Sequence, residues 1–143
     1  SANLLMLYSL LEAKLIKKGA PIIVPAVSWS TDLAPVVQLG LEPILCDCNL
    51  EDLSIDLSHF EELCKKHKPS ALILVSILGL VPDMKKIQDI CKKYNVLLLE
   101  DSCESFGLRA VLLTQMMIKC LTFSRAFEAM AGTGIWILIF KKD

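Results

Sequence analysis

The stretch Ser70–Asp101, SALILVSILGLVPDMKKIQDICKKYNVLLLED, decides the fold of this 143-residue chain. Ala71–Ser76 is a continuous apolar run that predicts a buried strand. Asp83 then stands as an N-cap before a helix. The apolar face of that helix carries Met84, Ile87, Ile90, Cys91 and Tyr94. Val96–Leu99 predicts a second buried strand, and strands that are apolar throughout are typical of a parallel sheet with helices on both faces.

The same alternation continues on both sides of this unit. Upstream we expect helices at Asn3–Lys18 and Thr31–Leu39, strands at Ile22–Val24 and Pro43–Cys48, and a helix N-capped by Ser58 with Glu61 in a capping box. Downstream we expect a helix at Arg109–Lys119 and strands at Leu121–Ser124 and Gly134–Phe140. Pro35 fits its helix only in the first turn. The pattern predicts an α/β fold in three layers, with a mainly parallel sheet and helices on both faces.

Composition excludes several classes of protein. The chain is 54% hydrophobic, with 15 basic and 16 acidic residues and a net charge of −1, so it has ample core and no basic excess for nucleic acid or an anionic membrane. Its longest uncharged stretches, Ser70–Pro82 and Ala129–Phe140, are shorter than the roughly 20 residues that span a bilayer. The charges after the first apolar run are in the wrong order for a signal peptide. We expect one domain over residues 1–143, with neither nucleic acid nor membrane as partner.

Six cysteines stand at positions 46, 48, 64, 91, 103 and 120. No two of them form a C-x-x-C pair, and only His59 and His67 could complete a zinc site, so we expect no metal. Cys64 and Cys91 lie on apolar helix faces, which is typical of reduced core cysteines in a cytoplasmic protein.

Candidate functional residues follow the predicted strands, because ligands bind at the carboxyl ends of strands in an open α/β sheet. Trp29, Asp101 and Glu104 share that edge. A flat ligand ring could stack on the indole, and a carboxylate could stabilise a protonated nitrogen in that ring. These groups therefore suit a flat, cationic heteroaromatic ligand. The start of the first helix, Ser1-Ala2, offers N–H groups to a phosphate. Rim packing of the indole, a turn-capping role for the carboxylate and a structural role for the Cys103 thiol remain open alternatives.

Four stretches carry a resemblance to the sugar-nucleotide aminotransferase family, the DegT/DnrJ/StrS group of pyridoxal-phosphate (PLP) enzymes of fold type I. They are SANLLMLYSLL from residue 1, IIVPAVSW from residue 22, GLEPILCDCNLEDLSID from residue 40 and LLLEDSCESFG from residue 97. The resemblance covers Ser1 to Gly107 and leans toward members that act on nucleotide-linked deoxyhexoses. It implies an aminotransferase that moves an amino group from glutamate to a nucleotide-linked keto-sugar, and a homodimer with shared sites.

The resemblance also implies roles for individual residues. Backbone N–H groups of Ser1 and Ala2 would hold the cofactor phosphate, and Trp29 would stack on the pyridine ring. Asp101, the expected catalytic residue, would pair with the pyridinium nitrogen and keep the ring an electron sink. Glu104 would lie near the ring hydroxyl.

Departures from the family pattern gather after Gly107. Ser124 matches a phosphate-binding serine of the family, but Ala129 stands where most members have the Schiff-base lysine and a dehydrase branch has histidine. Neither Ala129 nor Met130 can form an imine or accept a proton. We therefore expect a truncated or degenerate large domain, without the family's small C-terminal domain and inactive by itself. Two alternatives remain, a catalytically dead module that pairs with a full-length homologue and a flavodoxin- or receiver-like domain.

Overall fold

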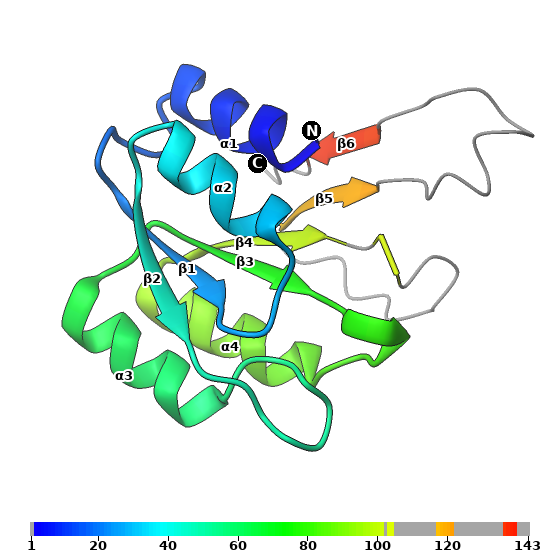
Figure 1. Cartoon of the computed structure of the whole chain (residues 1–143). Coiled ribbons are helices and arrows are strands. Elements are labelled where there is room, and N and C mark those ends of the chain that lie inside the picture. The colour runs from blue at the N-terminus through cyan, green and yellow to red at the C-terminus, as the bar shows by residue number, and fades with distance from the viewer. Residues whose placement is uncertain (1, 102, 105–116, 122–135, 140–143) are drawn as a thin grey trace, which may run out of the picture.

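The computed structural model describes residues 2–101, 103–104, 117–121 and 136–139 of the chain (Figure 1). In chain order its elements are α1 (Ala2–Glu12), β1 (Pro21–Pro25), α2 (Ser30–Gln38), β2 (Glu42–Cys46), α3 (Leu57–His67), β3 (Ala71–Val75), the 3-10 turn η1 (Ile77–Gly79), α4 (Met84–Tyr94), β4 (Leu97–Asp101), β5 (Met117–Leu121) and β6 (Trp136–Ile139). The strands form one sheet in the order β2-β1-β3-β4-β5-β6. All neighbours pair in parallel except β6, which is antiparallel to β5, so the predicted mainly parallel sheet is confirmed.

Helices cover both faces of this sheet, as the apolar strands predict. Helices α1 and α2 lie on one face, and α3 and α4 lie on the other (Figure 1). Successive side chains of a strand point to opposite faces, so Ile22 and Val24 of β1 pack toward α1 and α2 while Ile23 packs toward α3 and α4. Every residue of β3 and β4 is buried, because both strands are covered on both faces.

Helix α1 ends six residues earlier than the sequence predicts. Its end is a Schellman motif, in which Leu15 N–H donates to Leu10 O at 2.9 Å and Lys14 N–H donates to Leu11 O at 3.0 Å. Lys14 occupies the left-handed position, with φ of 58°. Glycine usually takes that position, so the sequence carries no signal for this stop.

The start of α3 also differs from the prediction. Asp56 is its N-cap and accepts the backbone N–H of His59 at 2.8 Å. Ser58 lies inside the helix and donates its hydroxyl to the same carboxylate. Glu61 does not close a capping box; its Oε1 accepts from Lys93 Nζ at 2.7 Å and from the Tyr94 hydroxyl at 2.9 Å, which ties α3 to α4. The predicted cap Asp83 is confirmed at the start of α4, where it accepts from Lys86 N–H.

The sequence predicts a helix at Arg109–Lys119, and this prediction is wrong for the last three residues, 117–119, because they form the start of β5. Strand β5 pairs with β4 from Leu98 to Asp101, so the backbone groups on that side of β4 are satisfied. Leu121 is the last residue of β5, and β6 lies within the strand predicted at Gly134–Phe140. The other residues of those three predicted segments lie outside the described ranges. Within the described ranges, no helix combines the length and apolarity needed to cross a bilayer.

Candidate functional site

The candidate site lies where the carboxyl ends of the parallel strands meet. Asp101 ends β4 and is in register with Val75, the last residue of β3, while Pro25 at the end of β1 is in register with Cys46. The chain reverses its direction of winding between β1 and β3, and doubly wound sheets place ligands at such a reversal. Trp29 lies in the connection after β1 and is the N-cap of α2.

A buried carboxamide joins two carboxylates at this edge. Asn3, in the first turn of α1, donates Nδ2 to Asp32 Oδ1 at 2.7 Å and to Asp101 Oδ2 at 2.8 Å. The exposed fractions of the three residues are 3%, 0% and 6%. Asp101 reaches this face of the sheet because it alternates with Leu97 and Leu99, which pack against α1 and α2. We call these three residues, Asn3, Asp32 and Asp101, the acidic bridge.

A proline inside α2 helps to hold the bridge. Pro35 lies in the second turn of α2, so its predicted restriction to the first turn is wrong. Proline has no N–H and cannot bond the carbonyl four residues earlier, which is that of Thr31. Asn3 Nδ2 approaches this carbonyl at 3.3 Å. The hydrogen bond that α2 lacks at Pro35 is thus replaced in part by the side chain that bridges the two carboxylates.

The carboxyl group of Asp32 has a raised pKa. Burial raises the pKa of Asp32 to about 6, and the charge of Asp101 adds to the increase. Hydrogen bonds from the Ser28 hydroxyl and from Trp29 N–H, the latter at 3.1 Å, oppose the increase because they favour the carboxylate. Asp32 therefore changes its protonation between mildly acidic and neutral pH, while most aspartates are fully ionised there.

Trp29 and Asp101 lie on the same edge of the sheet. The Trp29 backbone bonds Asp32, and Asp32 is joined to Asp101 through Asn3. Trp29 is 57% exposed, so a large part of the residue is accessible at this edge. The segment that carries this exposed indole is thus tied to the buried carboxylates through its backbone.

The other predicted residues have separate positions. Ala2 is buried at the first position of α1. Glu104 is exposed, and its Oε2 accepts from the N–H of Leu78 at 2.6 Å. Cys103 N–H donates to Asp101 Oδ1 at 3.0 Å, and burial followed by the charge of Asp101 raises the pKa of its thiol to about 12, so it is no nucleophile at neutral pH. Ser1, Ser124 and Ala129 lie outside the described residues.

Two members of the acidic bridge were missed as site residues. Asn3 entered the sequence analysis only as the start of a helix, and Asp32 only as part of one. A signal existed, since Asn3 is an amide in the mainly apolar run ANLLMLYSLL. A polar residue on a helix that is apolar all round is buried and needs a partner. The position of Pro35 four residues after Thr31 is a second signal, because it predicts a carbonyl without its helical donor.

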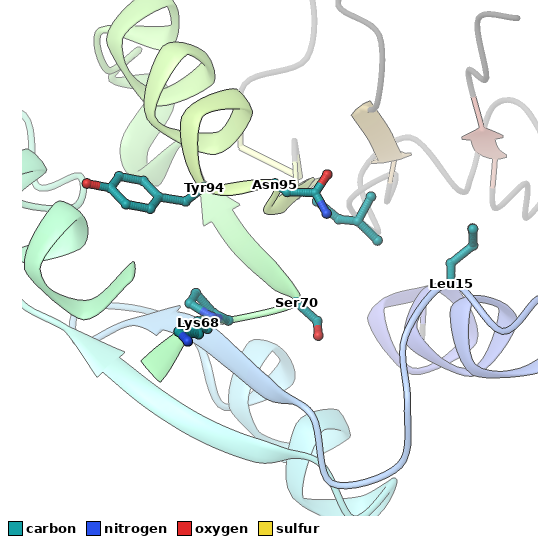
Figure 2. A pocket seen from close by; sticks show the side chains of 7 residues that line it. Leu15, Lys68, Ser70, Tyr94 and Asn95 are labelled. Atoms are coloured by element: carbon teal, nitrogen blue, oxygen red, sulfur yellow. The ribbon is translucent and has the colours of Figure 1, made fainter. Parts of the chain in front are cut away.

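A hollow of about 330 Å³ lies at the other end of the sheet (Figure 2). It is lined by Leu15, Lys68, Pro69, Ser70, Tyr94, Asn95 and Leu97. Ser70 precedes β3 and Leu97 begins β4, so the hollow faces the amino ends of the strands. It is separate from the acidic bridge and adds nothing to the candidate site.

These features define a domain of the doubly wound α/β class, with a buried acidic pair and an exposed tryptophan at its carboxyl edge. The strand order β2-β1-β3-β4-β5 is shared with flavodoxin-like sheets, so the order alone does not separate the two folds.

Comparison with known proteins assigns the family. The chain belongs to the DegT/DnrJ/EryC1/StrS aminotransferase family, whose sequence model matches residues 2–114. It is 39% identical over 109 residues to GDP-4-keto-6-deoxy-D-mannose 3-dehydratase of Escherichia coli O55:H7, covering 75% of this chain and 28% of the relative. It is 27% identical over 92 residues to GDP-perosamine synthase of Vibrio cholerae, covering 64% and 25%. The chain thus spans only about a quarter of these relatives.

Solved structures agree with this assignment. The E. coli GDP-4-keto-6-deoxy-D-mannose 3-dehydratase with bound hydrated PLP superimposes with a TM-score of 0.72 at 34% identity, over 83% of this chain and 32% of that one. A second structure of a GDP-4-keto-6-deoxymannose 3-dehydratase, with the same identity and coverage, holds a trapped PLP-glutamate geminal diamine. The predicted likeness to PLP-dependent enzymes in fold and family is confirmed.

Proposed function

We propose that this chain is the cofactor-binding part of the large domain of a PLP-dependent enzyme of nucleotide-sugar biosynthesis. The proposed reaction moves the amino group of glutamate to a nucleotide-linked keto-sugar. The observation that carries the proposal is the position of Asp101, held by Asn3 at the carboxyl edge of the sheet and joined through hydrogen bonds to the segment that presents Trp29.

The chemistry of the acidic bridge fits the pyridine ring of PLP. Its carboxylates accept hydrogen bonds, and Asn3 Oδ1 is a further buried acceptor without a hydrogen-bond partner among the described residues. A buried edge rich in acceptors favours a ligand that brings a cationic N–H group. A protonated pyridine nitrogen is such a group, and PLP with a protonated ring supplies an electron sink for amino-group chemistry.

Each remaining contact is proposed from the family pattern. Asp101 accepts the hydrogen bond of the pyridinium nitrogen, and Trp29 stacks on the ring. Ala2, the first residue of α1, and Ser1 before it in the sequence would present N–H groups to the phosphate, as helix N-termini do for anions. Glu104 lies near the ring hydroxyl, and Ser124 contacts the phosphate.

The substrates are proposed from the relatives. The dehydratase structure with a PLP-glutamate adduct supports glutamate as amino donor, and the names of both curated relatives support a GDP-linked sugar or a similar nucleotide sugar. With Ala129 in place of the family lysine, PLP is held here without a covalent bond. The whole enzyme would be a cytoplasmic homodimer.

A second candidate is 3-dehydration of the nucleotide sugar. The higher identity to the GDP-4-keto-6-deoxy-D-mannose 3-dehydratase, 39% against 27% for the perosamine synthase, favours it. Position 129 separates the two chemistries. We expect Ala129→Lys to form a borohydride-reducible adduct with PLP, and Ala129→His to form none. With GDP-4-keto-6-deoxy-D-mannose and glutamate as substrates, an amino-sugar product from the lysine variant supports transfer, and a deoxygenated product from the histidine variant supports dehydration.

Titration of the full chain with PLP tests the proposed function. The two tryptophans are at positions 29 and 136, so the Trp136→Phe background assigns the fluorescence to Trp29. We expect saturable quenching that pyridoxal without its phosphate does not match. Asp101→Asn should weaken binding at least roughly tenfold, about 1.4 kcal/mol, which is typical of a charged hydrogen bond. Asp89→Asn, an exposed carboxylate on α4, is the matched control. Absence of saturable binding contradicts the proposal and favours the dead pairing module.

A further inference from the structure

The acidic bridge contains two buried carboxylates, whereas the family pattern assigns only one, Asp101, to the ring nitrogen. Asp101 alone would supply the negative charge, yet a second buried carboxylate, Asp32, lies on the other side of the same amide nitrogen. Two buried like charges repel each other, and desolvation adds to the cost of keeping both ionised.

We infer that Asn3 and Asp32 are positioning residues for Asp101: Asn3 orients the Asp101 carboxylate, and Asp32 takes up or releases a proton beside it. This inference rests on the proposed function only where it concerns PLP. Both residues act through Asp101, and neither is assigned a contact with the cofactor.

The orientation of the Asn3 amide follows from its neighbours. Nδ2 has two hydrogens and three acceptors, of which Asp32 Oδ1 at 2.7 Å and Asp101 Oδ2 at 2.8 Å are nearer than Thr31 O at 3.3 Å. A flipped amide would place Oδ1 against both carboxylates, which is repulsive. The amide is therefore locked, and it fixes one oxygen of Asp101 while Cys103 N–H fixes the other at 3.0 Å.

Asp32 can hold a proton because one of its partners can reverse its role. The Ser28 hydroxyl, which donates to Asp32 Oδ2, can rotate and accept a proton from the same oxygen. Trp29 N–H also donates to Oδ2, and the Asp101 carboxylate is a further hydrogen-bond partner of Asp32. A proton on Asp32 Oδ2 therefore keeps its hydrogen bond with Ser28.

The groups that face Asp32 also favour this assignment. Among the described residues, β4 and the loop after it contribute the Asp101 carboxylate and the Cys103 thiol, and α1 contributes the neutral amide of Asn3. The start of α2 contributes the Ser28 hydroxyl and the Trp29 N–H. The charged neighbour is negative, and burial with this charge raises the pKa of Asp32 to about 6.

A consequence is that cation binding and proton release are linked. A cationic ring nitrogen that pairs with Asp101 removes the repulsion that favours a proton on Asp32. The pKa of Asp32 then falls, and near pH 6 the proton leaves Asp32 for solvent as the ligand binds. Because linkage is reciprocal, deprotonation of Asp32 strengthens binding of the protonated ring.

A titration of the full chain without cofactor tests the inference independently of PLP. Carboxyl ¹³C resonances of labelled aspartate are followed with pH, and the Asp32 signal is assigned by its loss in Asp32→Asn. We expect Asp32 to titrate near pH 6. Ser28→Ala should move the Asp32 midpoint upward, because it removes a hydrogen bond to the carboxylate. An Asp32 midpoint near 4 overturns the inference.

Calorimetry of PLP binding in buffers with different ionisation heats provides the second test. Near pH 6 the wild-type chain should release more protons on binding PLP than Asp32→Asn does, because only wild type can lose the Asp32 proton. Protons released by PLP itself are the same in both proteins and cancel in the comparison. Asn3→Ala should weaken binding roughly tenfold and move the Asp32 midpoint, with Asp89→Asn as control. Equal proton release in wild type and Asp32→Asn overturns the linkage. If the wild-type chain binds no PLP, the proposed function fails. The titration without cofactor still decides the roles of Asn3 and Asp32. If a variant does not fold, Ser28→Ala takes its place.

Discussion

Asn3 Nδ2 lies 2.8 Å from Oδ2 of Asp101, although 98 positions separate the two residues in the chain. The contact joins the first turn of α1 to the end of β4. It makes the site depend on the packing of α1 onto the sheet, where Met6, Leu7 and Leu10 are buried in the same core as Leu99. A change that loosens α1 should therefore affect the Asp101 carboxylate before it affects the rest of the sheet.

The raised pKa of Asp32 should make stability depend on pH. The folded chain binds the proton more tightly than the unfolded chain, so the stabilising contribution is complete below pH 4 and is lost as pH rises through about 6. An increase from 3.8 to about 6 corresponds to about 3 kcal/mol at most. Asp32→Asn removes this dependence. Urea unfolding between pH 4 and 8 measures the free energy of unfolding of both proteins, and the variant should gain stability relative to wild type as pH rises. A difference that stays constant with pH would refute the prediction.

Trp29→Ala should leave stability nearly unchanged, because the indole is 57% exposed. It should weaken PLP binding by roughly 2- to 10-fold, the effect of losing an aromatic contact of about 0.5–1.5 kcal/mol. Trp29→Phe keeps a ring and should recover most of the affinity. Thermal unfolding and an absorbance titration with PLP measure the two effects. If the affinity of the alanine variant equals that of wild type, the indole has no stacking role.

The contact between α3 and α4 should weaken in acid. Hydrogen bonds from Lys93 and Tyr94 lower the pKa of Glu61 to about 2. The contribution of Glu61 is thus present above pH 4.5 and is lost as pH falls toward 2. Because the Lys93 side chain is exposed and that of Glu61 is partly exposed, Glu61→Gln should lower the melting temperature only slightly at neutral pH, and less in high salt. The exposed neighbour Glu62→Gln is the control, and an equal effect of both substitutions would contradict the role of Glu61.

The chain should self-associate through the edge that carries the site. Large apolar side chains are exposed there, namely Val27, Trp29, Leu78, Leu80 and Val81. Exposed apolar patches of this kind mark interfaces. Light scattering should report a dimer or larger species for the wild-type chain and a smaller mass for the double variant Leu78→Ser and Val81→Ser. Leu15→Ser, at an exposed position near the amino ends of the strands, should change nothing. A wild-type chain that is monomeric at every concentration would contradict this interface.

The fold was predictable from local patterns, whereas the site was predictable only in part. Apolar runs identify β3 and the first three residues of β4, because strands covered on both faces are apolar along most of their length. The end of α1 was missed because Lys14 takes a conformation that usually belongs to glycine. Trp29 and Asp101 were found because they follow strands, but Asn3 and Asp32 belong to helices. Their role arises only when α1, α2 and β4 pack together, a long-range arrangement that local periodicity does not encode.

The central claim is that Asp101 holds a protonated pyridine ring at this edge. The most direct measurement is the ¹⁵N chemical shift of PLP labelled at the ring nitrogen and bound to the full chain at neutral pH. The account predicts the shift of a protonated pyridinium in the wild-type chain and of a neutral pyridine in Asp101→Asn. A neutral ring nitrogen in the wild-type complex, or the same shift in both proteins, would contradict it.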